Sequence, residues 1–205
     1  VSLLHIVTQW PKIESLFISC VHSLTHDDIV AALHVLPKLC VFSIEGTLGI
    51  IDDTLHELSR LHSKHLDTLY LESCRGITTS GINHILSTCP HLRTISYTSE
   101  EPTDYAMMGN ITTLIVNHTS SSAQTWIGIQ QHCTSLIHLH VVLNMYIDRM
   151  NLSGVISAVS IMPALRSLSF VFITQPQLAK VRRSLQTLRP TLLVVEEEYE
   201  AWCNM

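Results

Sequence analysis

The chain has 205 residues, a net charge of −5, 46% apolar residues and 14% charged residues. This composition supplies ample material for a continuous core and excludes a disordered chain, and no apolar run approaches the roughly 18 to 20 residues of a membrane span. The 12 lysines and arginines are scattered instead of forming a basic stripe, which argues against nucleic-acid binding because neutralised phosphates supply most of that affinity.

A repeated motif organises the sequence, and its clearest copy begins at Leu66 and ends where the next copy begins at Leu92. This copy reads LxxLxLxxC, then IT, then GI, then a short amphipathic stretch and CPxL. Successive first apolar positions lie 25 to 29 residues apart except for one step of 19, a spacing typical of leucine-rich repeats. These positions are Ile13, Leu39, Leu66, Leu92, Ile111, Leu136, Leu165 and Leu192. We therefore expect about eight repeats forming a single domain over residues 1–205.

Each repeat should begin with a short strand, because its apolar residues alternate after the first position. In the last repeat Val195 takes the second inward position, whereas Glu197 breaks the pattern at the third. Helices should follow where apolar residues recur at intervals of three and four. The residues with this helical period are Ile29, Leu33 and Leu36; Leu55, Leu58 and Leu61; Ile82, Ile85 and Leu86; and Leu178, Val181, Leu185 and Leu188. Thr25 and Thr78 should cap two of the helices, and the prolines at 11, 37, 90, 163 and 190 should follow helix ends.

The repeat centred on Cys74 resembles the cysteine-containing leucine-rich repeats of F-box/LRR proteins. The resemblance is carried by Cys74, Ile77, Thr78, Gly81 and Ile82, followed by Cys89, Pro90 and Leu92. It implies an α/β solenoid, a horseshoe like that of ribonuclease inhibitor, with parallel strands on the concave side and helices on the convex side. Proteins of this family are substrate receptors of cullin-RING ubiquitin ligases, in which an F-box recruits a Skp-type adaptor. No F-box is recognised in this sequence, and the chain is read as opening inside a repeat.

The residues between the inward strand positions should face the concave surface and contact a partner. Most are small hydroxyl residues, interrupted by a few larger side chains. The candidates for partner binding are Phe17, Val41, Tyr70, Glu72, Ile115, His138 and His140. This composition suits a protein or peptide better than a phosphate backbone.

The 19-residue repeat has no helical pattern after Tyr97, and such an irregular segment can project a binding loop. Tyr105 is its candidate for partner binding, with Met107 and Met108 beside it. A degenerate repeat without a binding role is the alternative interpretation.

Catalytic and metal-binding motifs are not found in the sequence. His138 and His140 share one strand face and could supply two metal ligands, but no third ligand is evident in the sequence. The six cysteines form no CxxC pair and are expected to be reduced thiols of a cytoplasmic or nuclear protein. We therefore expect neither an enzyme nor a cofactor.

The sequence predicts a protein-recognition module, the substrate-binding part of an F-box/LRR receptor. Its target should occupy the concave face, while the adaptor and cullin would be reached only through an F-box; nucleic acid and membrane are not expected as partners. A repeat scaffold outside any ubiquitin ligase is the main alternative. A GTPase-activating protein and a fragment of an extracellular receptor are less favoured interpretations.

Overall fold

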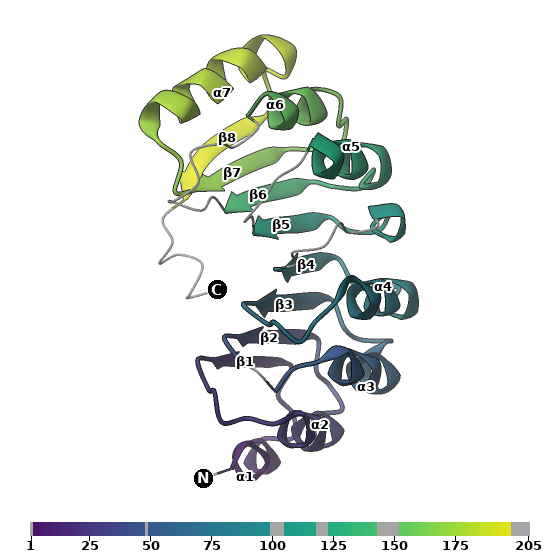
Figure 1. Ribbon diagram of the computed structural model, residues 1–205. Coiled ribbons are helices and arrows are strands. Elements are labelled where there is room, and N and C mark those ends of the chain that lie inside the picture. Colours follow the sequence, from purple (N-terminus) through teal and green to yellow (C-terminus); the bar gives the residue numbers. More distant parts are fainter. Residues whose placement is uncertain (1, 48, 99–104, 118–122, 143–151, 198–205) are drawn as a thin grey trace. The chain divides into compact units, whose positions relative to one another are not determined.

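The computed structural model describes residues 2–47, 49–98, 105–117, 123–142 and 152–197, and it divides into two compact units (Figure 1). The N-terminal unit spans Val1–Met107 and the C-terminal unit spans Met108–Met205. Among the described residues, no helix has both the length and the apolar character needed to cross a membrane.

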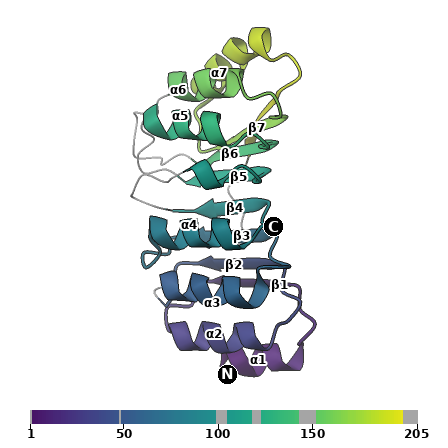
Figure 2. The same ribbon diagram turned by 90° about the vertical axis from the view of Figure 1, so that its right-hand side faces the viewer.

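Strands and helices alternate along the described part of the N-terminal unit (Figure 2). The elements are α1 (Leu3–Gln9), β1 (Ser15–Ser19), α2 (His26–His34), β2 (Val41–Glu45), α3 (Asp52–His62), β3 (Thr68–Glu72), α4 (Thr79–Thr88), β4 (Thr94–Tyr97) and the 3₁₀ helix η1 (Tyr105–Met107). The four strands are parallel and pair in chain order. Helices α1 to α4 pack successively against one another in a layer beside the sheet.

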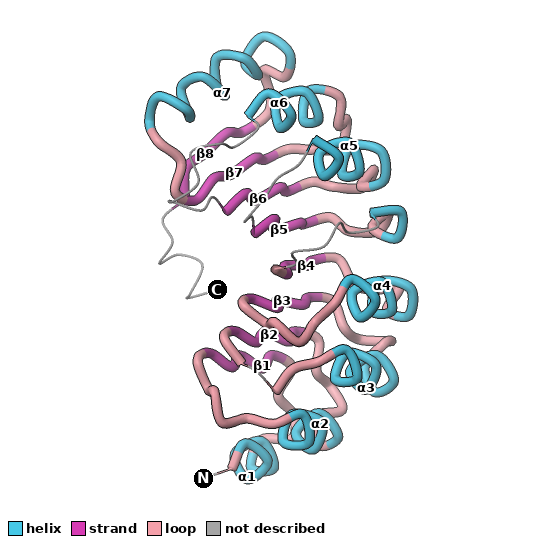
Figure 3. The backbone as a smooth tube through the Cα atoms, viewed as in Figure 1, coloured by secondary structure: helices cyan, strands magenta, loops and turns pink. Residues whose placement is uncertain are grey.

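The described part of the C-terminal unit repeats the same arrangement (Figure 3). Its elements are β5 (Thr113–Asn117), α5 (Ala123–His132), β6 (His138–Val142), α6 (Leu152–Ser160), β7 (Ser167–Val171), α7 (Gln175–Leu188) and β8 (Leu193–Glu197). Strands β5 to β8 are parallel and neighbours in sequence order. In both units, this alternation of parallel strand and helix is the α/β leucine-rich repeat arrangement.

The apolar positions of the repeat form the core. Leu39, Leu66, Leu92, Ile111, Leu136, Leu165 and Leu192 are buried, whereas Ile13 is only partly so. The helical period correctly identified α2, α3, α4 and α7, although Leu188 at the end of α7 is exposed. Helices α1, α5 and α6 were not predicted from the sequence.

Helix starts and stops follow the predicted capping. Thr25 begins α2 with a capping box, in which its hydroxyl accepts from the Asp28 amide and its own amide donates to the Asp28 carboxylate. Thr78 caps α4 by accepting from the Ser80 amide. Each of the five prolines lies within three residues of a helix end, as expected from its missing N–H.

Asp52 joins two consecutive repeats of the N-terminal unit. From the start of α3, its carboxylate accepts the Thr78 amide at 2.8 Å and the Thr78 hydroxyl at 2.6 Å. Gly81 makes room for this contact, because a Cβ atom there would lie 2.2 Å from Oδ1 of Asp52. The glycine of the cysteine-containing motif is therefore a packing requirement of the neighbouring repeat.

Arg189 plays a comparable part in the C-terminal unit. Its guanidinium donates to the carbonyl oxygens of Val159 at 3.2 Å, Met162, and Leu165 at 2.7 Å. These carbonyls lie at and after the end of α6, where helix carbonyls lack intrahelical partners. The side chain thus links α7 to the preceding repeat.

The predicted register of the last strand is wrong by one residue. Leu168 pairs with Val194 instead of Val195, and Phe170 pairs with Glu196. Residues 192–195 are all apolar, so alternation gives no information on which of them faces inward.

Candidate functional site

The sheet face turned away from the core of the N-terminal unit carries four of the eight predicted binding residues. We call it the N-terminal strand face, defined by Ser15, Phe17, Ser19, Val41, Ser43, Glu45, Thr68, Tyr70, Glu72, Thr94 and Ser96. These residues alternate with core residues such as Leu16 and Ile18, because successive strand side chains point to opposite sides. Thr68 and Ser96 lie on the face but are buried by their neighbours. Four predicted residues, Phe17, Val41, Tyr70 and Glu72, therefore share one surface.

Phe17 and Tyr70 lie in the same cross-strand row with Ser43 between them. Since neighbouring strands are about 4.8 Å apart, the backbones of the two aromatic residues are separated by about 10 Å. Phe17 is 52% exposed, whereas Tyr70 is half-buried. Burial raises the pKa of Tyr70, and the negative charges of Glu72 and Asp67 raise it further. Tyr70 is therefore a neutral phenol in a region of negative potential.

A second row holds two glutamates on neighbouring strands, Glu45 on β2 and Glu72 on β3. The Ser19 hydroxyl donates to Oε2 of Glu45 at 2.9 Å, and the Ser96 hydroxyl donates to Oε1 of Glu72 at 3.4 Å. The sequence alone predicted Glu72 but not Glu45 as a binding residue. Both glutamates stand six residues after the first apolar position of their repeats, Leu39 and Leu66, and this shared offset is the signal that would have revealed Glu45.

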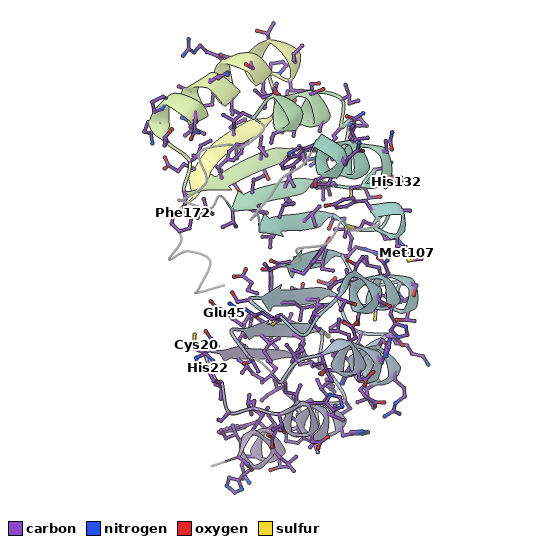
Figure 4. The ribbon with its side chains drawn as sticks, in the orientation of Figure 1. Cys20, His22, Glu45, Met107, His132 and Phe172 are labelled. Carbon is purple, nitrogen blue, oxygen red and sulfur yellow. The ribbon has the colours of Figure 1, made fainter. Side chains whose placement is uncertain are left out.

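The chain turns through a left-handed residue directly after three strands of this unit. Cys20, Gly46 and Ser73 have φ values of 56°, 63° and 54°. The Cys20 amide donates to the Glu45 carbonyl at 3.0 Å, and Nδ1 of His22 lies 2.8 Å from the Gly46 carbonyl. Figure 4 shows Cys20, His22 and Glu45 together at this edge of the sheet. No cluster of three or more His, Cys, Asp or Glu side chains suited to a metal ion occurs among the residues described.

The C-terminal strand face differs in chemistry from the N-terminal one. His138 is exposed and its Nδ1 lies 2.6 Å from the Ser167 hydroxyl; His140 is half-buried and its Nδ1 shares a hydrogen bond with the buried Ser169. These serines follow in register on β7. The two serine hydroxyls are therefore the hydrogen-bond partners of Nδ1 in the two rings.

Ile115 is not available on this face. Its side chain is 1% exposed, which contradicts the expectation from strand alternation that it reaches solvent. Alternation fixes the side of the sheet on which a residue lies, but burial also depends on what packs over it. An apolar side chain gains free energy from that covering, so Ile115 contributes to packing.

Tyr105 lies apart from the strand-face residues. It begins η1, which packs against α4 in the helix layer of the N-terminal unit, and it is half-buried. Its neighbour Met107 is 47% exposed on that side (Figure 4), whereas Met108 is fully buried. The structure therefore does not bring Tyr105 together with Phe17 or Tyr70.

A pocket of about 330 Å³ opens between the ends of α2 and α3 and is lined by His34, Arg60, His62, Lys64 and His65, among others. Nε2 of His62 lies 3.2 Å from the Leu33 carbonyl, and its buried Nδ1 has no hydrogen-bond partner among the described residues. Burial lowers the pKa of His62. Burial therefore disfavours a positive charge on His62 in this pocket.

The chain was compared with protein families, curated proteins and solved structures. No family model matches it, and no curated protein matches its sequence. A structure titled leiomodin-1 actin-binding site 2 is similar, with a TM-score of 0.45, 17% identity, and coverage of 92% of this chain and 95% of that one. A chain from the crystal structure of the Rad7 and Elc1 complex in yeast has a TM-score of 0.39, 13% identity, and coverage of 94% and 70%. Likenesses this weak assign the chain to no family.

Proposed function

We propose that this chain is a protein-recognition module that holds its partner on the N-terminal strand face. The observation that carries the proposal is the exposed Phe17 ring in one row with Tyr70, beside the ordered pair Glu45 and Glu72. Exposed aromatic side chains on a rigid element are effective anchors for a protein partner, because they bury a large area at a small cost in entropy.

The more specific part of the proposal is that the module serves as the substrate-binding part of an F-box/LRR receptor of a cullin-RING ligase. The support is the sequence resemblance, whose residues also have definite structural tasks in this chain. Cys74 is buried, Thr78 caps α4, and Gly81 makes space for Asp52. A scaffold outside any ligase is the alternative, since the same tasks arise in any repeat of this geometry.

Three further expectations belong to this proposal. The chain acts by binding and not by catalysis, it needs no cofactor, and it works in the cytoplasm or nucleus. Burial raises the pKa of Cys74 and Cys133 to about 12, which supports inert packing thiols in place of reactive ones.

Affinity purification from cells tests the proposal when the tagged protein is compared with a Phe17→Ala/Tyr70→Ala variant. Ile127→Ala is the matched control, because Ile127 is an exposed apolar residue of α5 in the other unit. We expect mass spectrometry to find a partner that the double variant loses and the control retains. Recovery of an adaptor and a cullin with that partner supports the receptor role. A partner without adaptor or cullin favours the scaffold, and no partner dependent on the strand face overturns the recognition proposal.

A further inference from the structure

We propose that the N-terminal strand face binds an arginine side chain of its partner, with the guanidinium at Glu45 and Glu72 and the side-chain stem between Phe17 and Tyr70. This inference rests on the proposed recognition function and specifies the chemistry of the bound segment. It follows from the charges, the aromatic row and the hydrogen bonds of the described strands.

Glu45 and Glu72 are the proposed contacts of the guanidinium. Glu45 and Glu72 are directly opposite each other on adjacent strands, an arrangement of like charges that destabilises a sheet. Strands β1 to β4 contain no lysine, arginine or histidine that could offset it from within the sheet. Among the described residues, the Ser19 and Ser96 hydroxyls donate to the two carboxylates. A cation supplied by the partner would relieve the repulsion and meet both acceptors.

The geometry of the pair favours arginine over lysine. The two carboxylates arise from backbones about 5 Å apart. A guanidinium offers five N–H donors in a planar fork and can bond to two carboxylates at once, whereas an ammonium is a compact point charge. Arginine also stacks on aromatic faces, which lysine does less readily.

The aromatic row is the proposed contact of the arginine stem. Phe17 and Tyr70 flank the small residue Ser43, with about 10 Å between the aromatic backbones. This row is adjacent to the glutamate row, two residues earlier along each strand. An arginine stem lying over Ser43 would contact apolar surface on both sides while its head reaches Glu45 and Glu72. The aromatic rings also attract a cation through their faces.

Charged residues of both signs surround this face. Glu14 precedes β1 and Asp67 precedes β3, and both are exposed, as are Lys12 before β1 and Lys38 before β2. Arg93 precedes β4, and its guanidinium donates to the carbonyls of Pro90 and Leu92. In the other unit, β5 to β7 carry His138 and His140 and no carboxylate, whereas β8 carries Glu196 and Glu197. The glutamate pair on β2 and β3, and not a wider acidic field, is therefore the proposed counterpart of the arginine.

Selection of peptides from a random dodecapeptide library displayed on phage, with the whole 205-residue chain as bait, tests this inference. A selected peptide would then be synthesised with arginine and with citrulline, its neutral isostere, and its Kd measured by fluorescence anisotropy. The same pair would be measured with Glu45→Gln/Glu72→Gln and with Phe17→Ala. The matched control is Asp27→Asn/Asp53→Asn, which changes the net charge equally at exposed positions on α2 and α3.

We expect the selected peptides to contain an arginine whose replacement by citrulline weakens binding about tenfold, the combined effect of two partly exposed ion pairs. The Glu45→Gln/Glu72→Gln variant should lose this preference, and the asparagine control should keep it. Peptides that require Phe17 but bind equally well with citrulline, or that keep the preference in the glutamine variant, overturn the arginine inference and leave the recognition function standing. If no selected peptide depends on Phe17, both are overturned.

Discussion

Replacing Gly81 by alanine should destabilise the N-terminal unit, although alanine is the better helix former. The added Cβ would lie 2.2 Å from Oδ1 and 2.7 Å from Cγ of Asp52, so the carboxylate must move away. That movement breaks its hydrogen bonds with the amide and hydroxyl of Thr78. A hydrogen bond to a charged group contributes about 1.5 kcal/mol at the lower end of its range, which suits this partly exposed site, so the two lost bonds amount to about 3 kcal/mol.

The gain in helix propensity on changing glycine to alanine is about 1 kcal/mol. The net expected loss is therefore about 2 kcal/mol, or a fall in Tm of about 4 to 8 °C for a chain of this length. Urea unfolding followed by far-UV circular dichroism measures the loss directly. Gly49→Ala is a useful comparison, because its Cβ would lie 2.1 Å from the Leu24 carbonyl oxygen and the obstacle there is backbone. It should be the more damaging of the two substitutions.

The Asp52→Ala background gives the decisive result. Without the carboxylate, the close contact that remains is the Cβ of residue 52 at 3.2 Å, which a small adjustment relieves. Gly81→Ala should then reverse sign and stabilise the chain by up to about 1 kcal/mol through helix propensity. An equal loss in both backgrounds, or a gain in the wild-type chain, would refute the packing argument.

Four other measurements follow from the structure. Arg189→Met keeps the side-chain stem but removes the N–H donors to three carbonyls, so it should lower the free energy of unfolding by about 3 kcal/mol. Hydrogen exchange of the β7 amides should become faster, and an unchanged exchange rate would contradict the proposed link between α7 and the preceding repeat. Iodoacetamide at pH 8 should modify the exposed Cys20 in the native protein and spare Cys74 and Cys133 until urea is added, as peptide mass mapping would detect. Because burial raises the pKa of those two thiols to about 12, the folded chain holds protons that the unfolded chain releases, and stability should decrease above about pH 8.5. Burial lowers the pKa of His62, so the free energy of unfolding should also decrease below about pH 6.5, where the unfolded chain takes up a proton that the folded chain does not. In urea titrations at pH 5 to 7, His62→Phe should reduce this dependence of the unfolding free energy on pH.

The repeat and its strands could be predicted from sequence because their apolar residues are periodic. Strands β1 to β7 begin two residues after the predicted first positions, as with Ser15 after Ile13 and Ser167 after Leu165. Where periodicity fails, the prediction fails with it. The uninterrupted apolar run at residues 192–195 left the register of β8 undetermined. Helix α5 was not predicted because its apolar residues do not all lie on one side: Trp126 and Ile129 are buried, whereas Ile127 is exposed.

The candidate site was only partly accessible from sequence. Strand alternation placed Phe17, Tyr70 and Glu72 on one surface, as the structure confirms. It could not show that Ile115 is covered, since burial depends on packing over the sheet and not on register alone. The repeat offset marks Glu45 as the counterpart of Glu72, but the strand register shows that the two residues lie directly opposite each other.

The left-handed backbone conformation that follows each of the first three strands does not depend on which residue type occupies the position. The conformation recurs with a cysteine, a glycine and a serine in place, at a cost of about 1 kcal/mol or more for each residue that is not glycine. The position can therefore change chemistry without altering the turn. Cys20 is exposed there, beside Glu45, while the described thiols of Cys74, Cys89 and Cys133 are buried. A fluorophore coupled to Cys20 would sit at the rim of the N-terminal strand face and would report in real time on any partner bound there.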